Sequence, residues 1–353
     1  VGAFLSGGID STTIVALMQK ISKEPVKTFS IGFKEQDYDE ARQAKMVAKY
    51  LGTDHSELYV SPEDTISILP KLPLIYDEPF ADNSQIPTFI VSELAKTKVK
   101  VSLSGDGGDE LFFGYSRYFQ AYSWWRKLRL IPKPIRHLLT LILISIPGTL
   151  LNGLHAFISH RFGIKHLRDR IPKFAHLINS PDWLTFYDRI ITQGNYPEPL
   201  VLYASKNKSF LSRYKQRIEG LSEPKKMMYL DTMQYLPDDI LTKVDRASMF
   251  VSLEARVPFL DHRLVEFAWR VPFKYKFRDN QGKWILRETL NRHVPKSLVD
   301  RPKKGFGVPI ESWLKGPLKE WAETLLNEEE LNSQGFFDSS AVKKMWTEHK
   351  EGK

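Results

Sequence analysis

Hydrophobic and polar positions follow two different spacings through the first hundred residues. Four short apolar runs indicate β-strands, at residues 1–5, 26–33, 55–60 and 99–103. Three intervening segments have apolar residues three or four positions apart and indicate helices, from Ile14 to Ile21, from Asp39 to Leu51 and from Pro62 to Leu72. Strands that alternate with helices predict an α/β fold, with a parallel sheet, flanking helices and right-handed crossovers.

Beyond Tyr115 the strand pattern stops. The stretch to about Pro224 contains helical segments rich in Trp, Leu, Arg and Lys, among them Trp124, Trp125 and Arg126. Such segments are typical of amphipathic helices whose basic side chains lie along apolar surface, and stacking of nucleic-acid bases is the alternative. We therefore expect a largely helical insertion, and from Trp313 onward the pattern predicts a helical C-terminal part.

Composition narrows the class of protein. The 353-residue chain is 42% hydrophobic, which is enough for a sizeable core. It contains no cysteine, which excludes disulfides, thiolate metal sites and a cysteine nucleophile and fits a cytoplasmic location. The net charge of +9 comes from scattered basic residues, so we expect no nucleic-acid partner. The apolar stretch Leu138 to Leu151 is too short to span a membrane and predicts a buried or surface-docked helix.

A glycine loop, Ser6-Gly7-Gly8, separates the first strand from the first helix. Adjacent glycines let backbone N–H groups turn toward an anion, and the positive end of the following helix dipole faces the same point. The loop therefore predicts a phosphate site. The alternative is helix capping by Asp10 or Ser11.

A second glycine loop with three carboxylates, Ser104 to Glu110, follows the fourth strand. Carboxylates such as Asp106 and Asp109 are ligands that Mg²⁺ prefers together with phosphates, and a plain acidic loop is the alternative. Because ligands of such sheets bind beyond the carboxyl ends of the strands, we expect the loops at Ser6, Gly32 and Gly105 to converge.

Charged residues lie among apolar ones in the C-terminal third, and structural ion pairs are the default interpretation: Lys243, Asp245, Arg246, Glu254, Arg256 and Asp261. The segment Lys283 to Glu288 has a helical pattern. A basic loop punctuated by proline and glycine, Arg301 to Pro309, is suited to neutralising pyrophosphate or is a simple surface loop.

The six residues Ser6 to Ser11 resemble the PP-loop of ATP pyrophosphatases, also called adenine nucleotide alpha hydrolase-like enzymes. Together with Ser104 to Glu110, Leu253 to Asp261 and Lys283 to Phe306, they resemble the synthetase domain of glutamine-dependent asparagine synthetases, in the same order. The resemblance implies an AMP-forming carbon–nitrogen ligase that uses ATP and Mg²⁺. In that reaction the side-chain carboxylate of aspartate becomes β-aspartyl-AMP with release of pyrophosphate, and ammonia then gives asparagine.

The resemblance also implies roles for individual residues. The phosphate loop would hold pyrophosphate through Ser6, Gly7, Gly8, Asp10 and Ser11, while Asp10 and Asp109 would bind Mg²⁺. The nucleotide would lie against Leu5, Ile31, Ser104 and Gly105. Asp106 falls where the family often has Glu and would place the acyl-adenylate; Lys303 would stabilise charge that develops on the α-phosphoryl group and the tetrahedral intermediate.

The implied organisation has three parts: a nucleotide-binding α/β core at 1–119, a variable helical insertion at 120–225, and a helical part at 226–353 that completes the active site. We expect the N-terminal glutaminase domain to be absent, since its cysteine nucleophile is missing and ammonia must then come from elsewhere. A homodimer is one assembly that the resemblance allows.

Other functions stay open. The best-known bacterial family members have an arginine near the segment Asp77 to Ser84, where this chain has none. An amidotransferase acting on another carboxylate, or an enzyme similar to β-lactam synthetases, would carry nearly the same motifs. A tRNA-modifying PP-loop ligase would suit the positive charge but lacks the segment Leu253 to Asp261, and a non-catalytic scaffold predicts gaps among the acidic ligands.

Overall fold

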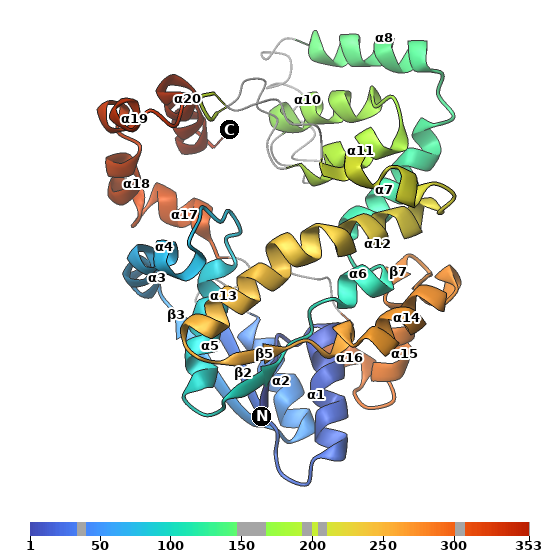
Figure 1. The fold of residues 1–353 in the computed structure, drawn as a ribbon, viewed down its shortest axis with the longest axis vertical. Helices are drawn as coiled ribbons and strands as arrows, with labels where there is room; N and C mark the ends of the chain where they lie inside the picture. The colour runs from blue at the N-terminus through green and yellow to red at the C-terminus, as the bar shows by residue number, and fades with distance from the viewer. Residues whose placement is uncertain (34–39, 147–166, 193–199, 204–209, 301–307, 353) are drawn as a thin grey trace. The chain divides into compact units, whose positions relative to one another are not determined.

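The computed structural model describes residues 1–33, 40–146, 167–192, 200–203, 210–300 and 308–352 (Figure 1). The chain forms two compact units. Unit 1 comprises Val1–Tyr115 and Pro224–Leu318, and unit 2 comprises Ser116–Glu223 and Lys319–Lys353. The three-part division that we expect from the sequence stays a prediction, because a compact unit is not by itself an independent domain.

Unit 1 is built on a five-stranded parallel sheet with the strand order β3-β2-β1-β4-β5. The strands are β1 (Gly2–Phe4), β2 (Lys27–Phe33), β3 (Asp54–Val60), β4 (Val101–Leu103) and β5 (Glu254–Arg256). In the register of the central strands, Ala3 of β1 lies between Thr28 of β2 and Leu103 of β4. The predicted α/β class with a parallel sheet is therefore confirmed.

One face of the sheet packs against α5 (Gln85–Lys96), α13 (Thr242–Phe250) and α17 (Ile310–Lys315). Side chains that alternate along β2, such as Phe29 and Ile31, point to this face and pack with Phe89 and Trp313 in one core cluster. All four are at most 2% exposed, so their burial supplies a large apolar contribution to stability. Helices α5 and α13 end shortly before β4 and β5 begin, so this core fixes the positions of both strands in the sheet.

The opposite face packs against α1 (Ile9–Ile21), α2 (Ala41–Leu51) and α15 (Trp284–Leu290). Ala3, Val15, Val47 and Leu290 form this second core with almost no exposure. A third cluster joins α1 to α6 (Gly108–Phe112), α14 (His262–Arg270) and the turn Pro258–Leu260. These cores bring α15, from late in the chain, against the helix that follows the first strand.

The four strands expected from apolar runs are present, within two residues at their ends. The fifth strand, β5, is not predicted by an apolar run because its three residues are Glu254, Ala255 and Arg256. It is an edge strand, so its charged side chains remain exposed and pair with each other at 2.7 Å. Charge on an exposed edge also discourages pairing with other chains.

The described remainder of unit 1 is helical apart from one β-hairpin. It contains α3 (Pro62–Ile68), the short 3-10 helix η1 (Leu69–Lys71), α4 (Leu72–Tyr76), α12 (Glu223–Met233), η4 (Leu236–Leu241), the 3-10 helix η6 (Phe273–Tyr275) and α16 (Lys296–Val299), with a two-stranded hairpin of β6 (Phe277–Arg278) and β7 (Gln281–Gly282). Helix α3 begins with a capping box between Ser61 and Asp64, which satisfies two backbone N–H groups.

Unit 2 is helical in its described residues, apart from a bridge between Val201 and Phe337. Its elements are α7 (Ser116–Leu128), α8 (Lys133–Ile144), α10 (Leu167–Ile178), α11 (Trp183–Ile191), η2 (Phe210–Tyr214), η3 (Gln216–Ile218), α18 (Lys319–Leu325), α19 (Glu328–Gln334) and α20 (Ser339–Lys350). The ring of Trp125 packs on Phe186 with centroids 5.2 Å apart. This indole therefore belongs to a helix–helix contact, as the amphipathic interpretation predicts.

The apolar stretch that begins at Leu138 lies on α8 as far as the structure describes it. Several of its side chains are exposed, including Leu138, Leu141 and Ile142. Among the described residues, no helix has both the length and the hydropathy that a bilayer crossing requires.

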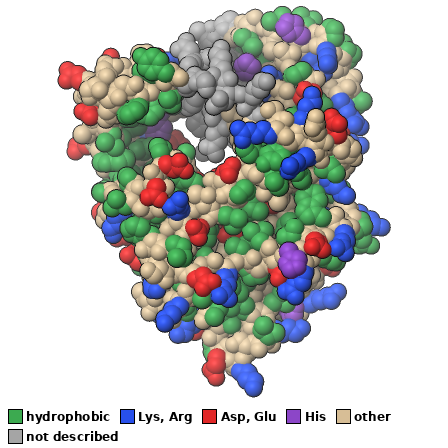
Figure 2. Space-filling view, viewed as in Figure 1, with side chains coloured by type: hydrophobic (Ala, Val, Ile, Leu, Met, Phe, Trp, Pro, Cys, Tyr) green, Lys and Arg blue, Asp and Glu red, His purple; other side chains and the backbone are tan. Residues whose placement is uncertain are grey.

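Lysine and arginine side chains are interspersed with acidic and apolar ones on the face that Figure 2 shows. A mixed distribution of this kind is typical of a solvated surface. The absence of a nucleic-acid partner stays a prediction.

Candidate active site

The first glycine loop connects β1 to α1 at the carboxyl edge of the sheet (Figure 1). Gly8 is the N-cap of α1 and the helix start has no side-chain cap, so the alternative in which Asp10 or Ser11 caps the helix is wrong. Instead the Ser11 hydroxyl lies 2.9 Å from the Ser6 hydroxyl and accepts from the Ser6 N–H at 3.2 Å. These contacts fold the loop back over the helix start, where an anion is favoured.

Gly7 has a backbone conformation that favours glycine, with φ of +72°. A Cβ atom here would also lie 2.8 Å from Cγ of Gln43 and 3.0 Å from the backbone nitrogen of Ala44. Glycine thus lets the loop turn sharply and lie directly against α2.

The two glycine loops are in direct contact. A Cβ atom on Gly105 would lie 2.7 Å from the backbone nitrogen of Ser11, and one on Gly108 would lie 2.5 Å from Oδ1 of Asp10. Both separations are shorter than real Cβ contacts, so only glycine allows the second loop to approach the first this closely. The expected convergence of the loops at Ser6 and Gly105 is therefore present.

Asp10 and Asp109 share one cation. The Nζ atom of Lys283 pairs with Oδ2 of Asp10 and lies 2.7 Å from Oδ1 of Asp109. All three side chains are less than one-fifth exposed. Gly114 is required beside them, because its Cβ would collide with Cε of Lys283 and with Oδ1 of Asp109.

Lys283 is held by its own backbone as well. It is the N-cap of α15 with φ of +58°, and its N–H donates to the carbonyl of Phe112 at 2.9 Å. Burial by itself lowers the pKa of Lys283, but the charges of Asp10 and Asp109 outweigh burial and raise it. Lys283 is therefore a permanent cation at this point.

Sequence reasoning assigned no role to Lys283. Its local signal is a lysine before a helical pattern, which is common on protein surfaces, and its partner Asp10 is 273 residues away in the chain. Only the packing of α15 against α1 brings the two together.

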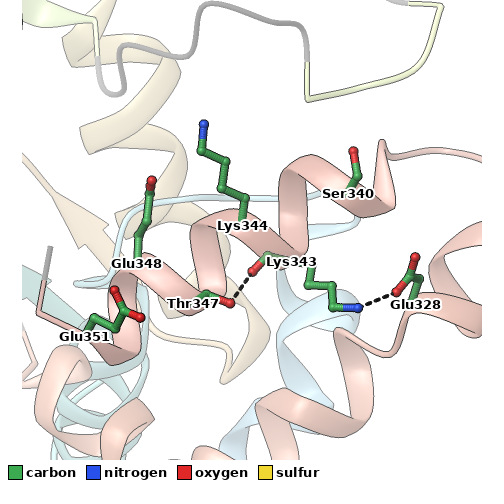
Figure 3. A pocket seen from close by; sticks show the side chains of 7 residues that line it. All are labelled: Glu328, Ser340, Lys343, Lys344, Thr347, Glu348 and Glu351. Atoms are coloured by element: carbon green, nitrogen blue, oxygen red, sulfur yellow. Dashed lines mark hydrogen bonds and ion pairs between the residues drawn. The ribbon is translucent and has the colours of Figure 1, made fainter.

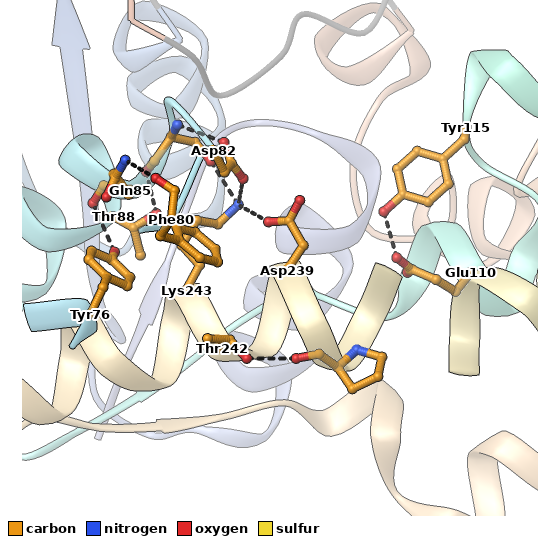
Figure 4. A network of polar contacts seen from close by, with 12 residues as sticks. Tyr76, Phe80, Asp82, Gln85, Thr88, Glu110, Tyr115, Asp239, Thr242 and Lys243 are labelled. Carbon is orange, nitrogen blue, oxygen red and sulfur yellow. Dashed lines mark hydrogen bonds and ion pairs between the residues drawn. The ribbon is translucent and has the colours of Figure 1, made fainter. Parts of the chain in front are cut away.

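Glu110, next to Asp109, is a second buried acid. It is 1% exposed and accepts a hydrogen bond from the Tyr115 hydroxyl at 2.5 Å (Figure 4). Burial and, to a smaller extent, the charge of Asp109 raise the pKa of Glu110 to about 7, although the hydrogen bond from Tyr115 acts in the opposite direction. This residue was also missed, because one more Glu after two Asp residues carries no distinct sequence signal.

The remaining candidate residues lie around the two loops, with one exception. The Ser104 hydroxyl donates to the Asp106 carboxylate, and the Ser104 N–H donates to the Arg256 carbonyl at 2.8 Å. Leu5 directly follows β1, Ile31 lies within β2 two residues before its end, and both are buried. Lys303 lies outside the described residues.

A separate hollow lies in unit 2, between α19 and α20 (Figure 3). Its lining includes an ion pair of 2.7 Å between Lys343 and Glu328 and further exposed charged side chains. None of the candidate residues from the sequence lines it.

Comparison with known proteins agrees with the geometry at the two loops. Residues 1–353 match the family model described as asparagine synthase. The chain belongs to the asparagine synthase family. It is 33% identical over 333 residues to glutamine-hydrolyzing asparagine synthetase 1 of Bacillus subtilis (strain 168), covering 94% of this chain and 50% of that protein.

Two further similar proteins have different names. A protein of Mycobacterium tuberculosis (strain ATCC 25618 / H37Rv), provisionally named a glutamine-hydrolyzing asparagine synthetase, is 34% identical over 365 residues, 100% of this chain and 51% of that protein. Amidase chyE of Penicillium rubens is 25% identical over 382 residues, which cover 97% of this chain and 54% of that protein. The chain spans about half the length of the relatives it matches.

We predict that Lys283→Met lowers the free energy of unfolding by about 3–5 kcal/mol, because two largely buried carboxylates lose their shared cation. Denaturant titration in the presence of a chelator measures this. The matched control is Lys315→Met, which removes a partly exposed lysine paired with Glu311 at 2.8 Å and should cost less than about 1 kcal/mol. Equal losses for both variants would show that Asp10 and Asp109 do not depend on Lys283.

Proposed function

We propose that this chain is an ATP-dependent amide-forming synthetase that converts aspartate to asparagine through β-aspartyl-AMP. The observation that carries the proposal is the convergence of the two glycine loops on Asp10, Lys283 and Asp109 in a chain of the asparagine synthase family. The loops provide backbone donors and carboxylates at one edge of a parallel sheet, where nucleotides bind in such folds, and the start of α15 adds a buried cation.

The first loop is the proposed pyrophosphate site. The start of α1 has no side-chain cap, so its backbone N–H groups are available to donate to a phosphate oxygen. The positive end of the helix dipole favours the negative charge of ATP at the same point. The expected surface for adenosine consists of Leu5, which follows β1, Ile31 in the neighbouring strand β2, and Ser104 with Gly105 in the second loop.

The residues present fit a magnesium ion. Mg²⁺ is usually held by one or two carboxylates together with substrate phosphates and water, and Asp10 and Asp109 provide two carboxylates. In the part of the chain that the structure describes, no group of three or more His, Cys, Asp or Glu side chains gathers into a complete metal site. When bound, the ion would neutralise charge on the phosphates and on the leaving pyrophosphate.

The proposed reaction has two steps. A side-chain carboxylate oxygen of aspartate forms a bond to the α-phosphorus of ATP, and the bond to the bridging oxygen of pyrophosphate breaks. Ammonia then forms a bond to the acyl carbon, AMP leaves, and the nitrogen loses a proton. The proposed role of Asp106 is to help place the acyl-adenylate, while Lys283 holds the Asp10 and Asp109 carboxylates in position.

We predict that aspartate promotes exchange of labelled pyrophosphate into ATP, and that ammonium but not glutamine supports asparagine formation by this chain. The second expectation follows because the chain has no thiol nucleophile for glutamine hydrolysis. Pyrophosphate exchange that requires another carboxylic acid, and does not occur with aspartate, would show that the chain acts on a different acceptor carboxylate. Release of glutamate from glutamine would contradict the nitrogen source.

A further prediction concerns Lys303, which we propose acts on charge that develops only during the reaction. We expect Lys303→Ala to leave ATP affinity within about threefold, while kcat falls by about 10²-fold or more, or ~2.7 kcal/mol. Calorimetric ATP titration and steady-state AMP release measure the two effects. The matched control is Lys304→Ala, and a larger loss in that variant would overturn the assignment.

A further inference from the structure

Helix α8 of unit 2 exposes apolar side chains and buries polar ones. Six of its twelve residues are aliphatic and between 37% and 57% exposed: Ile135, Leu138, Leu139, Leu141, Ile142 and Ile144. In Figure 2, apolar side chains gather over this helix at the upper right of the view. Ile135, Leu138 and Ile142 lie three and four positions apart, so they share one face and form an apolar stripe along it. A contiguous exposed stripe of this kind marks an interaction site, whereas single exposed leucines do not.

Polar contacts fix the opposite face of α8. Arg136 and Thr140, one turn apart, are at most 6% exposed. The Arg136 guanidinium donates to the Ser180 carbonyl at 2.9 Å, and the Thr140 hydroxyl lies 3.1 Å from the Ala175 carbonyl. Because these groups hold α8 against α10 and the residues that follow it, the apolar stripe faces away from that contact.

The excess positive charge of the chain is concentrated in the stretch that contains this helix. Residues 116–168 include no Asp or Glu and nine Lys or Arg: Arg117, Arg126, Lys127, Arg129, Lys133, Arg136, Arg161, Lys165 and Arg168. The whole chain has 51 Lys and Arg against 42 Asp and Glu, so the remaining residues carry equal numbers of basic and acidic side chains. The net charge of +9 is therefore gathered in one stretch and is not evenly scattered.

Exposed cations lie where α7 ends and α8 begins. Lys127 is in the last turn of α7, Lys133 is the first residue of α8, and neither forms an ion pair within the described part of the chain. Leu130, between them, is 78% exposed. Arg129 differs, because it pairs with Glu223 at 3.4 Å. The apolar stripe thus continues at its N-terminal end into an exposed leucine flanked by two lysines.

This combination favours a lipid surface over other partners. Anionic headgroups attract the lysines, and the boundary with the acyl chains accepts the aliphatic side chains. A nucleic acid would satisfy the cations alone, because the surface that it presents is dominated by phosphates. A second copy of the chain would cover the apolar stripe, but a two-fold contact would bring two equally basic stretches together.

We propose that α8 and the connection from α7 dock this chain on the surface of an anionic lipid bilayer, with the helix in the plane of the interface. The apolar stripe enters the boundary between headgroups and acyl chains, and Lys127 and Lys133 lie at the lipid phosphates. The inference goes beyond the proposed function and does not depend on it, because all candidate active-site residues belong to unit 1.

The test measures flotation of the purified chain with two kinds of vesicle, phosphatidylcholine alone and an equal mixture of phosphatidylcholine and phosphatidylglycerol. We expect at least about 10-fold tighter binding to the anionic vesicles, with a loss of affinity as salt is added. Leu138→Glu together with Ile142→Glu should weaken this binding about 10-fold or more, because the stripe no longer enters the bilayer. Lys127→Gln together with Lys133→Gln should weaken it about 10-fold through lost attraction to the headgroups.

The matched control is Leu325→Glu, which changes a 52% exposed leucine on α18 of the same unit and should bind as wild type does. Thermal unfolding shows whether each variant is folded, and we expect small shifts in Tm because the replaced side chains are exposed. If the variant of Leu138 and Ile142 does not fold, Leu141→Glu replaces it.

Four outcomes would overturn the proposal. The first is wild-type chain that does not float with anionic vesicles. The second is binding that the lysine variant loses and the Leu138 and Ile142 variant keeps, which would show attraction of a basic surface to any polyanion. The third is a dimer, detected by sedimentation, that Leu138→Glu dissociates while vesicles are not bound. The fourth is a large fall in Tm for Leu138→Glu without vesicle binding, which would show that another part of the chain covers the stripe.

Discussion

The ion pairs of Lys283 with Asp10 and Asp109 are the interaction on which the geometry of the candidate site depends. Two carboxylates so close together in a buried place repel each other strongly when both are ionised. A cation between them removes that repulsion and lets both loops keep their positions before any ligand arrives. The site is therefore preorganised by the protein itself, which is the condition under which electrostatic stabilisation is most effective.

Glycines, which have no side chain, are as important to the candidate site as the charged residues. Gly105 and Gly108 let one loop touch the other, and Gly114 leaves room for Lys283. Replacing any of them by alanine would push apart groups that must approach within hydrogen-bonding distance. The glycines at these three positions are thus explained by close approach; Gly7 and Gly107 differ, because their backbone angles also lie in the left-handed region.

Local sequence patterns were sufficient to predict some strands and loops of this molecule but not others. Strands such as β2 are predictable because their burial requires an apolar run, and the first loop is predictable because its two glycines sit at a strand-to-helix junction. Strand β5 and Lys283 were not predictable, since an exposed edge tolerates charges and a lysine is informative only when its distant partners are known. The roles of Asp106 and Lys303 came from resemblance alone and stay proposals.

The order of these parts along the chain constrains how the site forms. Asp10 and Asp109 lie before residue 116, while Lys283 lies after the whole segment of unit 2 that ends at Glu223. Closing a loop of this length costs conformational entropy that grows only slowly with length, and the packing of α15 against α1 in the second core offsets it. The carboxylates therefore acquire their cation only when the C-terminal part of unit 1 packs, so completion of the site is tied to completion of that unit's core.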